Sequence, residues 1–189
     1  AIDACLKKAG LTLADIDYFA WGWDAERYAN GGMRAFYDRV NEAYPPDDAT
    51  RGWQASCINT FQPKALEKRL RAALTRFYGA TEIPPLRFAP HHRSHAATAF
   101  YMSRFEEALV LTLDGSGDSD CATVWHGKGA SLEALHRIPI PHSVGWFYAA
   151  ITEFLGFQAY DGEYKVMGLA AYGEEDLAIR AALEKVLKV

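Results

Sequence analysis

Two histidines, His91 and His95, stand four residues apart just after Pro90. If this segment is helical, both imidazoles lie on one helix face with their Cβ atoms roughly 5–6 Å apart, so that two rings can share one metal ion. The residue after His91 is not glutamate, which excludes the His-Glu-x-x-His pattern of zinc proteases. A histidine pair at this spacing is also common in surface or capping positions, so the pair alone does not establish a metal site.

An acidic residue at the end of an apolar segment offers a third ligand. The run Ala108–Leu113 predicts a strand, and Asp114 follows it directly. The glycines that come next let backbone N–H groups approach a phosphate closely. The same run is also typical of a hairpin turn, because Asp-Gly is a favoured turn pair. Together the two segments predict a metal site beside a phosphate-binding turn, with the metal ligands His91, His95 and Asp114 and the turn residues Gly115, Ser116 and Gly117.

The elements that must position these residues alternate between helices and strands, which predicts an α/β layer. Apolar residues recur at helical spacing in several segments, and Gly10 and Gly79 are placed to end two of them. The predicted helices are 1–9, 64–78 and 92–103, and the predicted strands are 18–21 and 86–88. Three antiparallel strands then follow at 108–113, 121–126 and 132–138, with a helix capped by Ser143 and running to Leu155.

The segment Trp23–Thr60 is rich in aromatic residues and is predicted to be irregular, with a helix only at Arg34–Glu42. We interpret it as an insertion or lid over a cleft. Its aromatic side chains either stack on an acceptor molecule or pack the insertion onto the domain, and packing is the more common outcome; these side chains are Trp23, Tyr28, Tyr37 and Trp53.

A second glycine-punctuated loop spans residues 160–173, with a short helical core at Val166–Ala171. Its Lys165 is a compact cation that could reach a phosphate oxygen. The alternative is a surface ion pair of Lys165 with Glu163 or Asp161, which would contribute little. The candidate cofactor-binding residues of this loop are Gly162, Glu163 and Gly168.

Length, charge and cysteine content disfavour some classes of protein. The chain has 189 residues, half of them hydrophobic, and a formal net charge of −4, enough for one good core or two small ones. It lacks the basic stripe of a nucleic-acid-binding surface and any apolar run of about 18 residues that would predict a membrane span. Three scattered cysteines fit a reducing cytoplasm, with buried packing preferred over metal binding.

Three segments, taken in order and with their spacing, resemble the N-terminal half of O-carbamoyltransferases, the nodulation-type and antibiotic-tailoring enzymes. They are His91–Ala96, Leu111–Asp118 and Gly162–Gly173, of which the third is the most specific. The resemblance covers Leu11 to Gly173. It implies an actin-like ATPase fold of the RNase H-like and sugar-kinase-like type, with mixed sheets flanked by helices, related to the enzymes that threonylcarbamoylate tRNA.

The resemblance also implies a domain organisation. Residues 1–104 would be the C-terminal part of a first actin-like subdomain, carrying the insertion at about 23–60, and residues 105–189 would open the second. The chain opens in a helix without Met and closes on a helix-like run from Asp176. We therefore expect a partial chain. The resemblance implies a further aspartate ligand and a C-terminal nucleotide-activating domain beyond residue 189.

The chemistry implied by the resemblance uses ATP and carbamoyl phosphate. The nucleotide-activating domain forms carbamoyl adenylate, and the actin-like domain passes the carbamoyl group to a hydroxyl of a small acceptor such as a sugar, aminoglycoside or polyketide. The implied metal is iron; two imidazoles and a carboxylate alone suit Fe(II), Zn or Mn. His92 faces away from the metal ligands and is not counted among them, and His92 and Lys165 are the candidate catalytic residues.

Two alternatives stay open at this stage. The chain could be an inactive metal- or nucleotide-binding module, or a relative of the tRNA-threonylcarbamoylating enzymes. The aromatic insertion and the absence of a basic surface disfavour the second.

Overall fold

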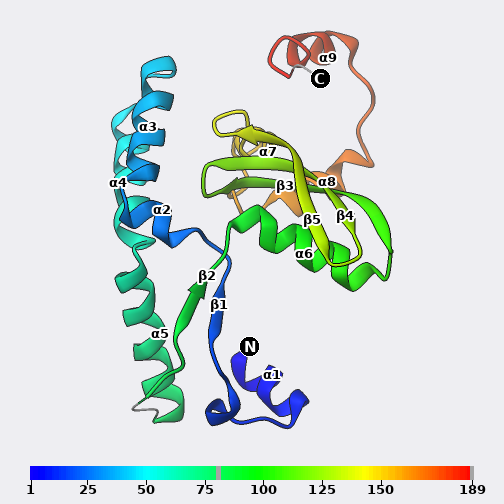
Figure 1. Cartoon of the computed structure of the whole chain (residues 1–189). Coiled ribbons are helices and arrows are strands. Elements are labelled where there is room, and N and C mark those ends of the chain that lie inside the picture. The colour runs from blue at the N-terminus through cyan, green and yellow to red at the C-terminus, as the bar shows by residue number, and fades with distance from the viewer. Residues whose placement is uncertain (80–81, 188–189) are drawn as a thin grey trace. The chain divides into compact units, whose positions relative to one another are not determined.

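The computed structural model describes residues 1–79 and 82–187. The chain divides into two compact units, Ala1–Val144 and Gly145–Val189. The first unit contains a two-stranded parallel sheet and a three-stranded antiparallel sheet, both flanked by helices (Figure 1). This confirms the predicted α/β class with mixed sheets. The predicted division near residue 104 concerns the subdomains of a larger fold and stays a prediction.

The parallel sheet forms from two very short strands that are far apart in the sequence. Helix α1 (Ile2–Ala9) ends at Gly10, whose left-handed conformation (φ 68) suits glycine, and a 3-10 turn, η1 (Leu13–Asp15), leads to β1 (Phe19–Trp21). Strand β1 pairs with β2 (Leu86–Phe88). Because the strands are parallel, the residues that follow each of them emerge at the same edge of the sheet.

The segment predicted to be irregular is mostly helical, so that prediction is wrong, although the helix predicted at Arg34–Glu42 is present. It forms α2 (Ala25–Ala29), α3 (Gly32–Ala43) and α4 (Asp48–Thr60), followed by the predicted helix α5 (Pro63–Tyr78). Aspartate side chains cap two of these helices: Asp24 accepts from the Arg27 N–H at 3.3 Å and Asp47 from the Thr50 N–H at 2.8 Å. These caps start helices where the aromatic and glycine content suggested loops.

Buried side chains hold the four helices together. Met33, Leu66 and Leu74 are almost fully buried, and Tyr28 and Tyr37 are each 3% exposed. The packing interpretation is therefore correct for these two tyrosines. Two reciprocal amide hydrogen bonds, of 3.0 and 2.9 Å, join Asn41 on α3 to Gln54 on α4, and Trp53 contacts Tyr37 edge-on. In Figure 1, α3 and α4 run alongside each other.

The antiparallel sheet consists of β3 (Glu107–Gly117), β4 (Asp120–Lys128) and β5 (Ser131–Pro139), in that order. Helix α6 (His91–Ser103) packs on one face of it through a core of Ala96, Phe100, Val110 and Trp125. The three strands were predicted, but each is longer than predicted. Pairing of Gly117 with Asp120 puts the hairpin turn at residues 118–119, so the glycine run predicted as a turn is the irregular end of β3.

The described part of the second unit, up to residue 187, contains three short helices. They are α7 (Val144–Phe154), which begins at the last residue of the first unit, α8 (Glu163–Ala170) and α9 (Leu177–Leu183). Asp176 caps α9 through two hydrogen bonds of 2.8 and 3.1 Å. Residues 188–189 of the predicted last helix lie outside the described residues. Among the helices described, none combines the length and the apolar character needed to cross a membrane.

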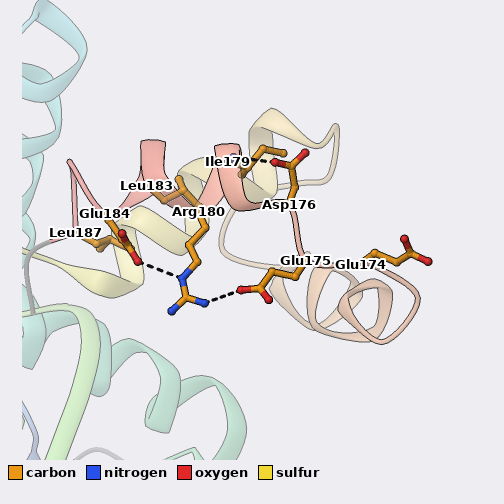
Figure 2. A pocket seen from close by; sticks show the side chains of 8 residues that line it. All are labelled: Glu174, Glu175, Asp176, Ile179, Arg180, Leu183, Glu184 and Leu187. Carbon is orange, nitrogen blue, oxygen red and sulfur yellow. Dashed lines mark hydrogen bonds and ion pairs between the residues drawn. The ribbon is translucent and has the colours of Figure 1, made fainter.

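A hollow lies beside α9, and Figure 2 shows Arg180 within it, reaching toward Glu175 on one side and Glu184 on the other. Both ion pairs are solvent-exposed, and exposed pairs of this kind contribute little to stability. Because its cation is already paired with carboxylates, this hollow is not a candidate for substrate binding.

Candidate metal centre

The centre forms where the two parallel strands end. After β2 the chain passes through Ala89, whose N–H donates to the Trp21 carbonyl at 3.0 Å, and then enters α6. His91, the first residue of α6, points its ring back toward β1, where its Nδ1 lies 3.0 Å from the Gly22 carbonyl oxygen. Since a carbonyl can only accept, Nδ1 carries the proton. In the neutral ring, Nε2 is then the atom left free to bind a metal.

Three side-chain atoms converge beside this ring. His91 Nε2 lies 2.9 Å from Asp114 Oδ2 and 2.9 Å from His95 Nε2, and His95 Nε2 lies 3.4 Å from the same carboxylate oxygen. Atoms that bind one ion at about 2.0–2.2 Å, at angles near 90–110°, lie about 3.0–3.5 Å from one another. The three side chains therefore fit a single metal ion. They form the one such triplet among the described histidines, cysteines and acids.

The electrostatics of the centre favour a charged carboxylate. The hydrogen bond from His91 lowers the pKa of Asp114, against the opposing effect of partial burial. Burial alone would lower the pKa of His91, but the hydrogen bond and charge of Asp114 and the Gly22 carbonyl outweigh it and raise that pKa. Asp114 is thus ready to bind a cation, and a metal would compete with the proton on His91.

Asp118 positions the centre, and the sequence analysis did not assign it a role. Its Oδ1 accepts from the Asp24 N–H at 3.0 Å and its Oδ2 from the His91 N–H at 2.9 Å. One buried carboxylate thereby ties the start of α2 to the start of α6, and its burial raises its pKa. The signal that could have found it is the second aspartate of the Asp-Gly-Ser-Gly-Asp run, at the tip of the hairpin, where it adopts a left-handed conformation (φ 55).

Two of the predicted phosphate-binding residues support the metal ligands. A Cβ on Gly117 would lie only 2.5 Å from His91 Cγ and closer still to Cδ2, so the ring fits only because residue 117 is glycine. The Gly115 N–H donates to Asp114 Oδ1 at 2.8 Å, which leaves Oδ2 for the centre. Ser116 lies between them on β3 and is half-buried. Their proposed contact with phosphate stays a prediction.

His92 lies between α6 and the sheet, on a different face from the centre. Its Nδ1 is 2.7 Å from the Thr112 hydroxyl, its Nε2 is 3.0 Å from the Asp120 carbonyl, and it is 3% exposed. Burial lowers the pKa of His92. With both ring nitrogens bonded to protein, His92 fastens the helix to the sheet and has no free nitrogen for a substrate.

The remaining predicted residues belong to the second unit. The Lys165 ammonium lies 5.9 and 5.7 Å from the ring centres of Phe157 and Tyr164. Among the described residues it forms no ion pair with an acid, so the predicted alternative pairing is not observed. Glu163 accepts from the Tyr160 N–H at 2.8 Å. A Cβ on Gly162 would meet the Gln158 carbonyl, which gives this glycine a packing role, whereas the space beside Gly168 is open.

Trp23 forms one wall of the centre. Its ring stacks on Phe61 with centroids 4.2 Å apart and lies 4.7 Å from the His91 ring. The sequence analysis considered Trp23 as a platform for an acceptor. The structure places it against a metal ligand, where it shields one side of the imidazole from water.

Comparison with known proteins identifies the family of the chain. The family model described as "Carbamoyltransferase N-terminus" matches residues 1–189. The chain is 37% identical over 178 residues to an uncharacterized protein of Synechocystis sp., and 36% identical over 176 residues to Nodulation protein NolNO of Sinorhizobium fredii. Each alignment covers 92% of this chain but only 28% and 23% of the respective relative. Nodulation protein NolO of Bradyrhizobium diazoefficiens is 44% identical over 86 residues, which is 46% of this chain and 16% of that protein.

Proposed function

Because the chain belongs to the carbamoyltransferase N-terminal family, we propose that the whole protein transfers a carbamoyl group to a hydroxyl of a small-molecule acceptor. In this proposal His91, His95 and Asp114 hold a metal ion at the transfer site. The observation that carries it is the convergence of their three ligand atoms, all within 4.8 Å of one another. Support for the chemistry comes from the family and from relatives named as nodulation proteins.

The finer steps are part of the same proposal. The donor is carbamoyl phosphate, activated with ATP to carbamoyl adenylate by a domain outside this chain, and the fold of the whole is actin-like. Two imidazoles and one carboxylate leave coordination positions open and suit Fe(II), Zn or Mn, of which we propose iron. An ion held by His91, His95 and Asp114 would supply Lewis acidity toward the carbamoyl carbonyl.

The protein's own residues prepare the centre for that role. The Gly22 carbonyl fixes the His91 tautomer, and the Gly115 N–H orients the carboxylate of Asp114. The side chain of His91 is 15% exposed and that of His95 is 53% exposed. Substrates therefore approach from the His95 side, while Trp23 covers the His91 side.

Phosphate groups of the nucleotide are the proposed ligands of the two glycine-containing segments. Lys165 is exposed and has no carboxylate partner among the described residues, so its charge is available for a phosphate or carbamoyl oxygen. Gly115 and Gly117 support this role less strongly, because one N–H is bonded to Asp114 and the other glycine accommodates His91. We assign no proton transfer to His92, whose ring nitrogens are both bonded within the protein.

The test is substitution of the most exposed ligand. We expect His95→Ala to lose bound metal, measured by elemental analysis, and to abolish carbamoyl transfer in the full-length protein. His136→Ala is the matched control, because His136 is exposed on β5 and outside the triplet. Unchanged metal content in His95→Ala would contradict the assignment. If metal were lost but transfer continued, the centre would be a binding module without a part in the reaction.

A further inference from the structure

A second binding feature lies next to the metal centre, within the first unit. A hollow of about 590 Å³ opens between α2, α3 and the tip of the β3–β4 hairpin, and His91 forms part of its wall. Arg137 from β5 lines it, as do two arginines of the helical segment, Arg27 from α2 and Arg39 from α3. Their guanidinium carbons lie 5.8 and 6.0 Å from the ring centre of the buried Phe36. Both guanidinium groups are therefore within cation–π distance of the same aromatic ring.

The acids around this hollow are bonded to groups other than the guanidinium groups of Arg27 and Arg39. Asp24 caps α2, Asp118 accepts from two backbone N–H groups, and Asp120 pairs with Arg137 at 2.8 Å. Arg27 donates to the neutral hydroxyl of the buried Ser119 at 2.7 Å. Within residues 1–79 and 82–187, neither Arg27 nor Arg39 forms an ion pair with a carboxylate. The hollow is thus lined by two guanidinium groups without a carboxylate partner among the described residues, and also by Asp24, Asp118, Asp120 and Arg137.

We propose that this hollow binds an oxyanion of the phosphate type, held by Arg27 and Arg39. Guanidinium groups present planar, paired N–H donors that match phosphate oxygens, and such charge-assisted hydrogen bonds are stronger than neutral ones. Because His91 lines the same hollow, the anion lies on a molecule that reaches the metal centre. The inference rests on the proposed function only for the identity of that molecule.

The experiment is a titration of the chain with inorganic phosphate, followed by 31P NMR line broadening. We expect saturable binding that weakens at least tenfold in Arg27→Gln and in Arg39→Gln. Arg34→Gln is the matched control, because Arg34 is exposed on α3 and does not line the hollow. Arg39→Lys keeps the charge but loses the paired donors, and should bind phosphate with intermediate affinity. Thermal melts of each variant establish that the fold is intact.

The outcomes separate the possible sources of the anion. Displacement of phosphate by carbamoyl phosphate or ATP assigns the hollow to the donor, and displacement by a phosphorylated sugar assigns it to the acceptor. His95→Ala should retain phosphate binding, so a failure of the metal assignment leaves this inference standing. Absence of saturable binding to the folded chain, or equal binding by the wild type and the folded Arg39→Gln variant, would overturn the inference.

Discussion

Replacing Gly117 with alanine tests whether His91 is held in place by the backbone that surrounds it. An alanine Cβ would lie 2.5 Å from His91 Cγ, whereas carbon atoms in contact are separated by about 3.5 Å or more. The ring must therefore retreat by about 1 Å. On the other side stands Trp23, with its ring centre 4.7 Å from that of the imidazole, so the retreat cannot be made freely.

A movement of that size disconnects the histidine from its partners. The bond from Nδ1 to the Gly22 carbonyl is 3.0 Å long and the contact from Nε2 to Asp114 is 2.9 Å. Both would approach or exceed the roughly 3.5 Å beyond which a hydrogen bond is lost. We expect metal affinity to fall about 10- to 100-fold, the usual cost of disturbing the support of a metal ligand. Overpacking should also destabilise the fold by about 1–3 kcal/mol.

The assay is a Co(II) titration followed by visible absorption, with a chelator as competitor, together with thermal unfolding of the metal-free protein. Gly52→Ala is the matched control, since a Cβ at that position in α4 meets nothing within 4 Å. Its melting temperature should hold or rise, because alanine favours a helix interior over glycine by up to about 1 kcal/mol. Wild-type Co(II) affinity and an unchanged melt in Gly117→Ala would refute the reasoning.

Two further predictions concern buried titratable groups. Burial raises the pKa values of the Tyr28 and Tyr37 phenols well above their ordinary 10.0, so the folded state keeps protons that the unfolded chain releases. Stability should be fully present below about pH 10 and fall as the pH rises further, which urea midpoints at pH 8 and pH 11 can measure; an equal fall in a Tyr28→Phe/Tyr37→Phe double variant would contradict this origin. Burial also raises the pKa of the Cys121 thiol, so maleimide should label the exposed Cys5 quickly and Cys121 only after unfolding. Equal labelling rates at the two thiols would show that the sheet opens readily.

Local sequence patterns were sufficient to predict which three side chains come together at the centre. Helical spacing places His91 and His95 on one face, and an acid after an apolar strand is well placed to meet them. The sequence did not reveal what orients the His91 ring toward Asp114 and His95. Its ring is oriented by Gly22, which follows a three-residue strand paired in parallel with another 67 residues away in the sequence. Strands this short carry almost no periodic signal, so their pairing has no local signature.

The run Gly115–Gly117 illustrates a different limit of sequence-based prediction. Glycine between an apolar strand and an aspartate is equally consistent with a phosphate-binding turn, a hairpin turn or a close approach by another side chain. Only the third interpretation depends on a residue elsewhere in the chain, and for Gly117 the structure shows that this residue is His91. The helices α2 and α4 were missed for a similar reason. The composition of this segment, rich in aromatic residues and glycine, suggested a loop. The caps at Asp24 and Asp47 are recognisable mainly once the helices are known.

The two histidines of the centre are not equivalent, and the difference has a structural cause. His91 is fixed through its backbone N–H by Asp118, through Nδ1 by Gly22, and on its faces by Trp23 and by the space that Gly117 leaves. His95, one turn later on α6, has only the other two members of the triplet as its polar partners among the described residues. The geometry of the centre is therefore determined by His91 and the elements that meet around it, and His95 completes a site whose first ligand is already in position. A side chain held in this way needs little rearrangement to bind an ion. Most of the conformational entropy needed to order the site is therefore lost during folding. Metal binding then carries a smaller entropic cost, which favours higher affinity.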